Sequence, residues 1–160
     1  MSHPSLGAPP PDLSAGASAA AMRLNSVAAR LAGRALELAV ERDPTLTARH
    51  DPTALRQLLR DAETLIERIS RSMAAADLAF VREFADAIAP LYRRRRVPMD
   101  DLVSILEGLR LAMTSVLKPD DVAAADEAVD AAVAVFRDYR RLAGDARKRN
   151  KVISFLYKGA

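Results

Sequence analysis

The sequence lacks cysteine and has few aromatic residues. Without cysteine, the 160-residue chain can form no disulfides, thiolate zinc sites, iron–sulfur clusters or cysteine nucleophiles. Half of the residues are hydrophobic but only 4% are aromatic, so a core must be built from Ala, Leu, Val, Ile and Met. Small side chains allow short distances between helix axes. The composition therefore favours closely packed helices.

Long apolar runs and strand patterns are also missing. The longest apolar runs are far shorter than the roughly 20 residues that span a bilayer. The N-terminus lacks the basic start and apolar run of a signal peptide, so we expect a cytoplasmic protein. We find no Asn-Gly or Asp-Gly hairpin and no sustained alternation of apolar and polar residues.

Five stretches instead show the three- and four-residue apolar spacing of amphipathic helices. The first is expected from 19 to 42. The second opens at Asp51-Pro52, an N-cap followed by proline at the first helical position. A third starts near Leu78, and the sequence leaves open whether it continues the second. The last two follow the breaks at Val97-Pro98 and Lys118-Pro119. We predict an all-α fold, either a four- to five-helix bundle or a globin-like arrangement.

Composition divides the chain into three parts. Residues 1–18 are mainly Pro, Ser, Gly and Ala and are predicted to be a disordered tail. Residues 19–145 are predicted to form the helical bundle, and residues 146–160 a basic and apolar tail. The net charge of +3 is modest, but residues 137–160 carry eight basic residues against two acidic ones.

We find no constellation of residues typical of catalysis or of metal binding. His3 lies in the predicted tail, and His50 is expected to be an exposed loop residue, so neither suits a haem ligand. No glutamate has a histidine three residues on, as di-metal bundle sites require. There is no Gly-x-Ser-x-Gly elbow and no glycine-rich phosphate loop. We therefore predict no enzyme activity, no metal and no cofactor.

Two segments are candidate partner-binding sites. The first is the run Arg93, Arg94, Arg95 and Arg96, which opposes the dipole at a helix end. Such a run suits phosphate or nucleic acid, but four adjacent residues on a helix point in four directions, which argues against a nucleic-acid patch. The second segment combines basic Arg147, Lys148, Arg149 and Lys151 with apolar Phe155, Leu156 and Tyr157.

Three hypotheses remain for the second segment. Its apolar residues either pack on the bundle or across a dimer, or engage a partner protein, or touch an anionic membrane surface together with the basic residues.

The segment from Phe84 to Arg110 joins a helix ending in arginines, a turn with proline and a Leu-rich helix that begins with Asp. This pattern resembles the helical N-terminal domain of RsbT co-antagonist proteins, and the similarity extends over residues 51–141. The resemblance implies a sensory or regulatory domain, commonly dimeric, with no catalytic residues of its own and with 93–98 as its signature turn. Family members often carry glycine in this turn, where this chain has Arg96 or Val97, and they usually continue into an output domain.

These observations predict a non-enzymatic bacterial regulatory domain that acts through protein–protein contacts as a homodimer. Two alternatives remain open. One is a helical protein that binds a small hydrophobic ligand in space opened by a kink at Pro90. The other is a tail-driven adaptor at a membrane surface. A domain without an output module would have to signal through its surface or its tail.

Overall fold

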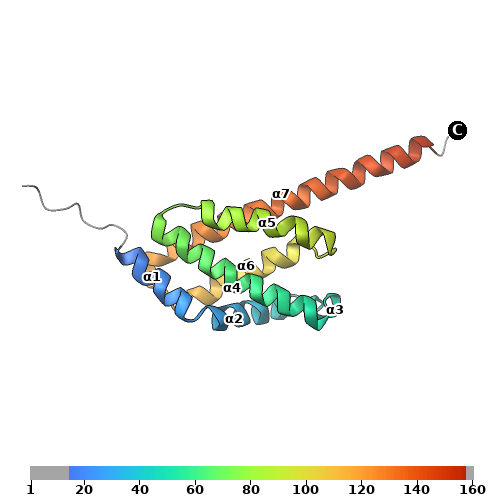
Figure 1. Cartoon of the computed structure of the whole chain (residues 1–160). Coiled ribbons are helices and arrows are strands. Elements are labelled where there is room, and N and C mark those ends of the chain that lie inside the picture. The colour runs from blue at the N-terminus through green and yellow to red at the C-terminus, as the bar shows by residue number, and fades with distance from the viewer. Residues whose placement is uncertain (1–14, 158–160) are drawn as a thin grey trace, which may run out of the picture.

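The computed structural model describes residues 15–157, with side chains from 19 to 142. This part of the chain is all-α and contains no strand, which confirms the all-α part of the prediction. Its elements are α1 (Ala15–Ser26), α2 (Ala28–Arg42), α3 (Leu46–Arg49), α4 (Pro52–Ala75), α5 (Ala79–Arg94), α6 (Met99–Met113) and α7 (Pro119–Tyr157). Helix α4 crosses the middle of the molecule (Figure 1) and contacts α1, α2, α5, α6 and α7.

The single helix predicted from 19 to 42 is wrong, because the structure divides it at Val27. The backbone there leaves the helical region, with φ −128° and ψ 18°. The Val27 N–H donates to the Leu24 carbonyl at 3.2 Å, which tightens the last turn of α1. The break lets α1 pack on α4 while α2 packs mainly on α6. Two short helices thus bury their apolar faces against different neighbours.

The second and third predicted helices are separate. Ala76 has a left-handed backbone, with φ 49°. Its N–H donates to the Met73 carbonyl at 3.4 Å, and the next N–H, from Asp77, donates to Ser72 at 3.1 Å. These paired bonds are the Schellman arrangement that ends a helix. The chain therefore turns between α4 and α5.

The predicted start of α4 is confirmed. The Asp51 side chain accepts a hydrogen bond from the Ala54 N–H at 2.7 Å, and Pro52 is the first helical residue. Pro90, which was expected to kink the third helix, lies inside α5, and the helix continues on both sides of it from Ala79 to Arg94.

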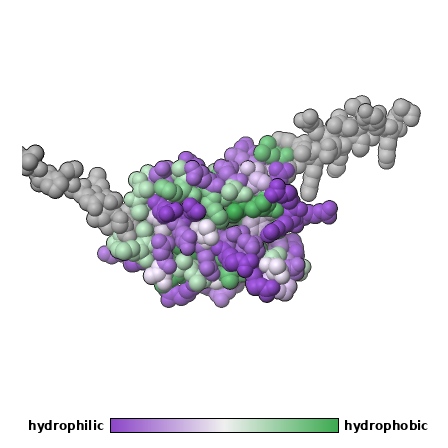
Figure 2. Space-filling view, viewed as in Figure 1, coloured by the Kyte–Doolittle hydropathy of each residue, from purple (hydrophilic) through white to green (hydrophobic). Residues whose placement is uncertain are grey.

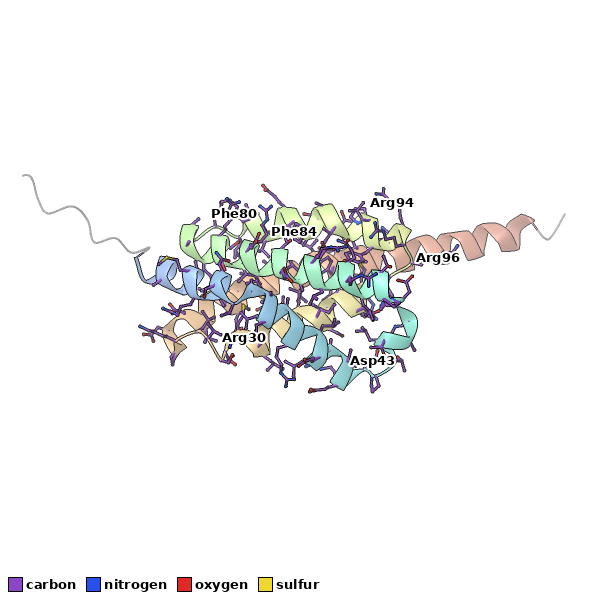
Figure 3. All side chains as sticks on the ribbon, turned by 60° about the horizontal axis from the view of Figure 1, so that its bottom comes forward. Arg30, Asp43, Phe80, Phe84, Arg94 and Arg96 are labelled. Atoms are coloured by element: carbon purple, nitrogen blue, oxygen red, sulfur yellow. The ribbon has the colours of Figure 1, made fainter. Side chains whose placement is uncertain are left out.

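The core is aliphatic and rich in alanine, as the composition predicts. Helices α2 and α6 approach so closely that a Cβ on Gly108 would clash with the carbonyl of Ala35. Leu91 on α5 is 44% exposed, whereas the adjacent Tyr92 is buried. The rings of Phe80 and Phe84 lie on α5 at the edge of the bundle (Figure 3), where the guanidiniums of Arg71 and Arg68 lie 5.8 Å from their centroids.

Helix α7 continues beyond the other helices (Figure 1). Among its described side chains, Phe136 is the last that is buried, Tyr139 is half-buried and Leu142 is 58% exposed. The segment predicted as a tail from 146 is helical up to Tyr157. None of the helices in the described range is long and apolar enough to cross a membrane.

Candidate functional site

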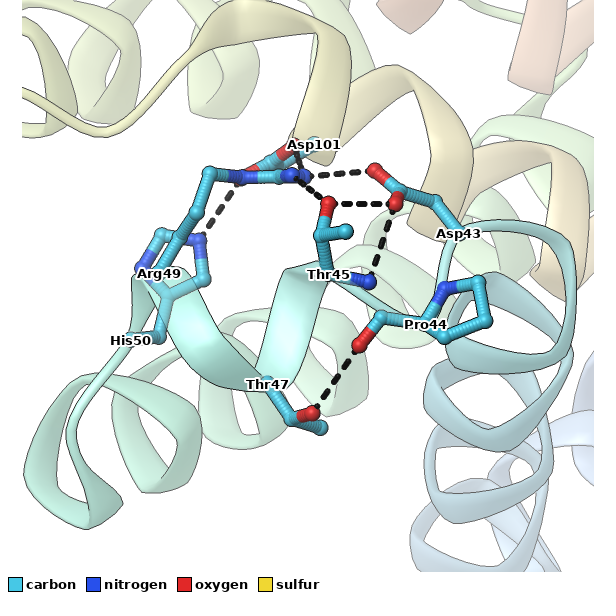
Figure 4. Close-up of polar contacts among 7 residues, drawn as sticks. All are labelled: Asp43, Pro44, Thr45, Thr47, Arg49, His50 and Asp101. Atoms are coloured by element: carbon cyan, nitrogen blue, oxygen red, sulfur yellow. Dashed lines mark hydrogen bonds and ion pairs between the residues drawn. The ribbon is translucent and has the colours of Figure 1, made fainter.

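The short connection between α2 and α4 folds around a single carboxylate, that of Asp43 (Figure 4). Asp43 precedes Pro44 and accepts hydrogen bonds from the Thr45 N–H at 3.1 Å and the Thr45 hydroxyl at 2.6 Å. A carboxylate that bonds the backbone two residues on is the Asx turn that Asp favours. The Thr47 hydroxyl donates to the Pro44 carbonyl at 3.2 Å. These bonds fix the direction of α3.

Arg49, at the end of α3, joins this connection to α6. Its guanidinium lies 2.7 Å from Asp43 Oδ2 and 2.7 Å from Asp101 Oδ1. Hydrogen bonds to Asp101 and Asp43 raise the pKa of Arg49 above its ordinary value. The Thr45 hydroxyl and the Arg49 guanidinium lower the pKa of Asp43.

His50 was predicted to be an exposed loop residue, and this is wrong. The residue is 8% exposed, and its Nε2 lies 2.6 Å from Oδ2 of Asp101, which is itself 4% exposed. Because a carboxylate accepts, the ring N–H donates to it. A buried polar ring needs such a partner, and Asp101, 51 residues further along the chain, supplies it. Asp101 thus places a negative charge in the first turn of α6 and also binds the buried ring of His50.

The turn between α5 and α6 lines the same hollow as the end of α3 and the first turns of α4. Arg96 has a left-handed backbone with φ 60°. Its N–H donates to the Arg93 carbonyl at 3.0 Å, and the Val97 N–H donates to the Tyr92 carbonyl at 3.0 Å. This is a second Schellman ending, and the buried pair Tyr92 and Val97 supplies its usual apolar contact.

The Tyr92 hydroxyl links α5 to α4 by donating to the carboxylate of Asp61. Gln57 also donates to Asp61, at 3.1 Å. Burial, followed by the hydrogen bond to Asp61, raises the pKa of Tyr92 well above its ordinary value. The phenol therefore remains a donor over the whole neutral range.

A hollow of about 640 Å³ opens between these two loops. Its walls come from the end of α3, the first turns of α4 and the α5–α6 turn. The lining residues are Arg49, His50, Asp51, Thr53, Ala54, Gln57, Tyr92, Arg95, Arg96, Val97 and Pro98. A concave site of this size with converging polar groups is the usual form of a small-molecule site.

The four predicted arginines do not act as one group. Arg93 and Arg94 belong to the last turn of α5, whereas Arg95 and Arg96 lie in the turn and line the hollow. Arg94 and Arg96 lie at the same end of the molecule in Figure 3. All four are exposed. Nothing in the structure tests the predicted partner contact, so it stays a prediction.

The second predicted segment belongs to the distal part of α7. The side chains of Arg147, Lys148, Arg149, Lys151, Phe155, Leu156 and Tyr157 lie outside those that the structure describes. Among the described side chains, the large hydrophobic residues that are exposed are Met22, Leu91, Leu111 and Leu142. On the face shown in Figure 2, apolar residues form a band among hydrophilic ones.

Sequence reasoning missed the hollow and the residues on its α4 side. Its walls come from residues 49–57 and 92–98, which no local pattern connects. Between 19 and 142, no three His, Asp or Glu side chains are grouped as metal ligands would be.

Comparison with known protein families and with curated proteins finds no match to this chain. The resemblance of residues 51–141 to RsbT co-antagonist domains is therefore still a prediction.

Proposed function

We propose that this chain is a non-enzymatic regulatory domain that acts through protein–protein contacts and pairs with a second copy through the distal part of α7. The observation that carries the proposal is the length of α7. It has 39 residues, or about 58 Å at 1.5 Å per residue, whereas α4 at the centre of the bundle has 24.

The distal half of α7 extends past the bundle that stabilises its first half. Isolated helices are marginal in water, and most helices in proteins depend on packing of an apolar face. A helix that continues beyond Phe136, the last buried residue among its described side chains, gains stability when another helix covers it. A second copy of the same chain supplies an identical helix in a symmetric arrangement.

The spacing of apolar residues along α7 supports pairing with another helix. Val135 and Tyr139 pack against the bundle core. Leu142, Ala146, Ile153 and Leu156 continue their register of alternating steps of four and three beyond it. Alternating steps of this kind give the 3.5-residue period of coiled coils. Arg149 is the one polar member of the series, and a polar residue in a seam fixes its register at some cost in stability.

The proposal is tested by analytical ultracentrifugation of the full chain at about 10 µM, which is about ten times a Kd of 1 µM, or about −8.2 kcal/mol of association free energy. We expect a dimer. The double substitution I153S/L156S removes two seam residues and should give a monomer. The control V152S/F155S removes two apolar residues outside the seam and should remain a dimer. A monomeric full chain, or equal behaviour of the two variants, would contradict the proposal.

A further inference from the structure

The lining of the hollow between the α3–α4 connection and the α5–α6 turn includes three arginines, Arg49, Arg95 and Arg96, and one aspartate, Asp51. Arg49 already forms ion pairs with Asp43 and Asp101. Among the described side chains, Arg95 and Arg96 have no carboxylate oxygen within ion-pair distance. Arg95 and Arg96 thus line a concave surface and are exposed, with no ion-pair partner among the described side chains.

We propose that this hollow binds a small organic oxyanion, carried as a phosphate or carboxylate group, and that Arg95 and Arg96 hold its charged end. A guanidinium presents parallel N–H donors that match the oxygens of both groups. The inference rests on the geometry of the hollow and is independent of the proposed pairing through α7.

The backbone of Arg96 supports this assignment. Its left-handed conformation, with φ 60°, is unfavourable for an ordinary L-residue, and glycine usually occupies such a position after a helix. Strained non-glycine residues are concentrated at binding and catalytic sites. Here the strained residue is a cation on the wall of the hollow.

The rest of the lining suits the body of an organic ligand. Tyr92, Val97 and Pro98 give apolar surface, while Thr53 and Gln57 add a hydroxyl and an amide. The volume of about 640 Å³ lies within the range of roughly 300–1,000 Å³ that small-molecule sites occupy, and it exceeds the need of a bare phosphate ion.

Asp51, the acidic residue of the lining, already accepts a hydrogen bond from the backbone of α4. One oxygen of Asp51 accepts the Ala54 N–H at 2.7 Å. The same residue caps α4, a helix of 24 residues whose amino end carries partial positive charge. Within the lining, a bound anion therefore meets Arg95, Arg96 and the amino end of α4 together with the one carboxylate of Asp51. The carboxylates behind the lining are bonded to lining residues, Asp61 to Tyr92 and Asp101 to Arg49 and His50.

The test is a titration of the ¹⁵N-labelled full chain with phenyl phosphate, benzoate and benzyl alcohol, followed by backbone amide shifts. We expect saturable shifts at residues 53–57 and 95–97 with at least one of the two anions and none with the neutral alcohol. The tighter of the two anions distinguishes a phosphate ligand from a carboxylate ligand. Equal shifts with benzyl alcohol, or no saturable shift with either anion, would overturn the proposal.

Variants of the arginine run provide a matched control within four residues. R95Q/R96N, in which Asn tolerates the left-handed backbone, should weaken anion binding at least roughly tenfold, because each charge-assisted bond is worth about one tenfold step or more. R93Q/R94Q removes the same charge outside the hollow and should bind as the parent chain does. R95Q alone leaves residue 96 unchanged and tests the site if the double variant is unfolded by circular dichroism. Undiminished binding by the Arg95 variants, or equal loss in R93Q/R94Q, would contradict the proposal.

Discussion

At the residue scale, two helical glycines have opposite roles. A Cβ at Gly108 would clash with the carbonyl of Ala35 where α6 crosses α2, whereas a Cβ at Gly33 meets nothing within 4 Å. Gly108→Ala should therefore lower the free energy of unfolding by about 1–3 kcal/mol, as overpacking does. Gly33→Ala should raise it by about 0.5–1 kcal/mol, because alanine is the better helix former. Urea denaturation of both variants measures the difference, and equal effects would mean that α2 and α6 do not approach so closely.

Tyr92 gives a prediction for alkaline pH. Its folded pKa is raised by burial and by the bond to Asp61, whereas an unfolded tyrosine ionises near pH 10. Above about pH 10 the unfolded chain loses the phenolic proton while the folded chain keeps it, so this contribution to stability falls by up to about 1.4 kcal/mol per pH unit. It is fully present below that pH.

The measurement is the free energy of unfolding in urea between pH 8 and 11, for the parent chain and for Tyr92→Phe. The variant loses one hydrogen bond, so it should be less stable by about 1 kcal/mol at pH 8. It should also lose the part of the alkaline slope that comes from this phenol. An unchanged slope would show that Tyr92 ionises equally easily in the folded and unfolded chain.

At the scale of elements, Asp101 ties α6 to the connection that leads into α4. Asp101→Asn keeps the shape but removes the charge that Arg49 and His50 share. Arg49 is 35% exposed, so solvent screens part of the loss, and we expect a decrease of about 1–3 kcal/mol in the free energy of unfolding.

Asp100→Asn is the matched control. Asp100 lies in the same first turn of α6, so both substitutions remove the same favourable charge from the helix dipole. Its ion pair with Arg140 is exposed on both sides, and the expected change is within about 0.5 kcal/mol. Equal losses in the two variants would assign the effect to the dipole and not to the buried contacts.

The elements that were predictable from sequence are those with a local chemical mark. Asp51-Pro52 predicted the start of α4, because an N-cap side chain and a proline at the first helical position both act within one helical turn. The break at Val27 is not marked by a proline or glycine in the sequence. It arises because α1 and α2 pack against different helices. The left-handed turns at Ala76 and Arg96 could not be predicted from the sequence, because glycine, the usual residue at such a position, is absent from both.

The site was less predictable than the fold for a physical reason. His50 and Asp101 are 51 residues apart, and burial of the histidine depends on that distant carboxylate. The arginine run was visible in the sequence, but the left-handed turn at Arg96 is what separates Arg95 and Arg96 from Arg93 and Arg94. Only the three-dimensional arrangement places two members of the run on a hollow.

At the scale of the whole molecule, the question is where the bundle ends on α7. Phe136 is fully buried, whereas Leu142 is 58% exposed. Phe136→Ala should cost about 3–5 kcal/mol, as the removal of a buried aromatic ring does. Leu142→Ala should change the free energy of unfolding by less than about 0.5 kcal/mol in dilute solution. A contrast of this kind in urea denaturation places the edge of the core between these two residues.

Removal of residues 143–160 extends the same argument. If the bundle is complete by Leu142, the shortened chain should unfold cooperatively with a free energy within about 1 kcal/mol of the full chain at submicromolar concentration, where pairing adds little by mass action. If that segment packs on the bundle instead, its removal should cost several kcal/mol or abolish the transition, as the loss of core contacts does. Circular dichroism in urea distinguishes the two results. The first outcome leaves the distal part of α7 free to pair, and the second makes it part of the fold and removes the physical basis for pairing.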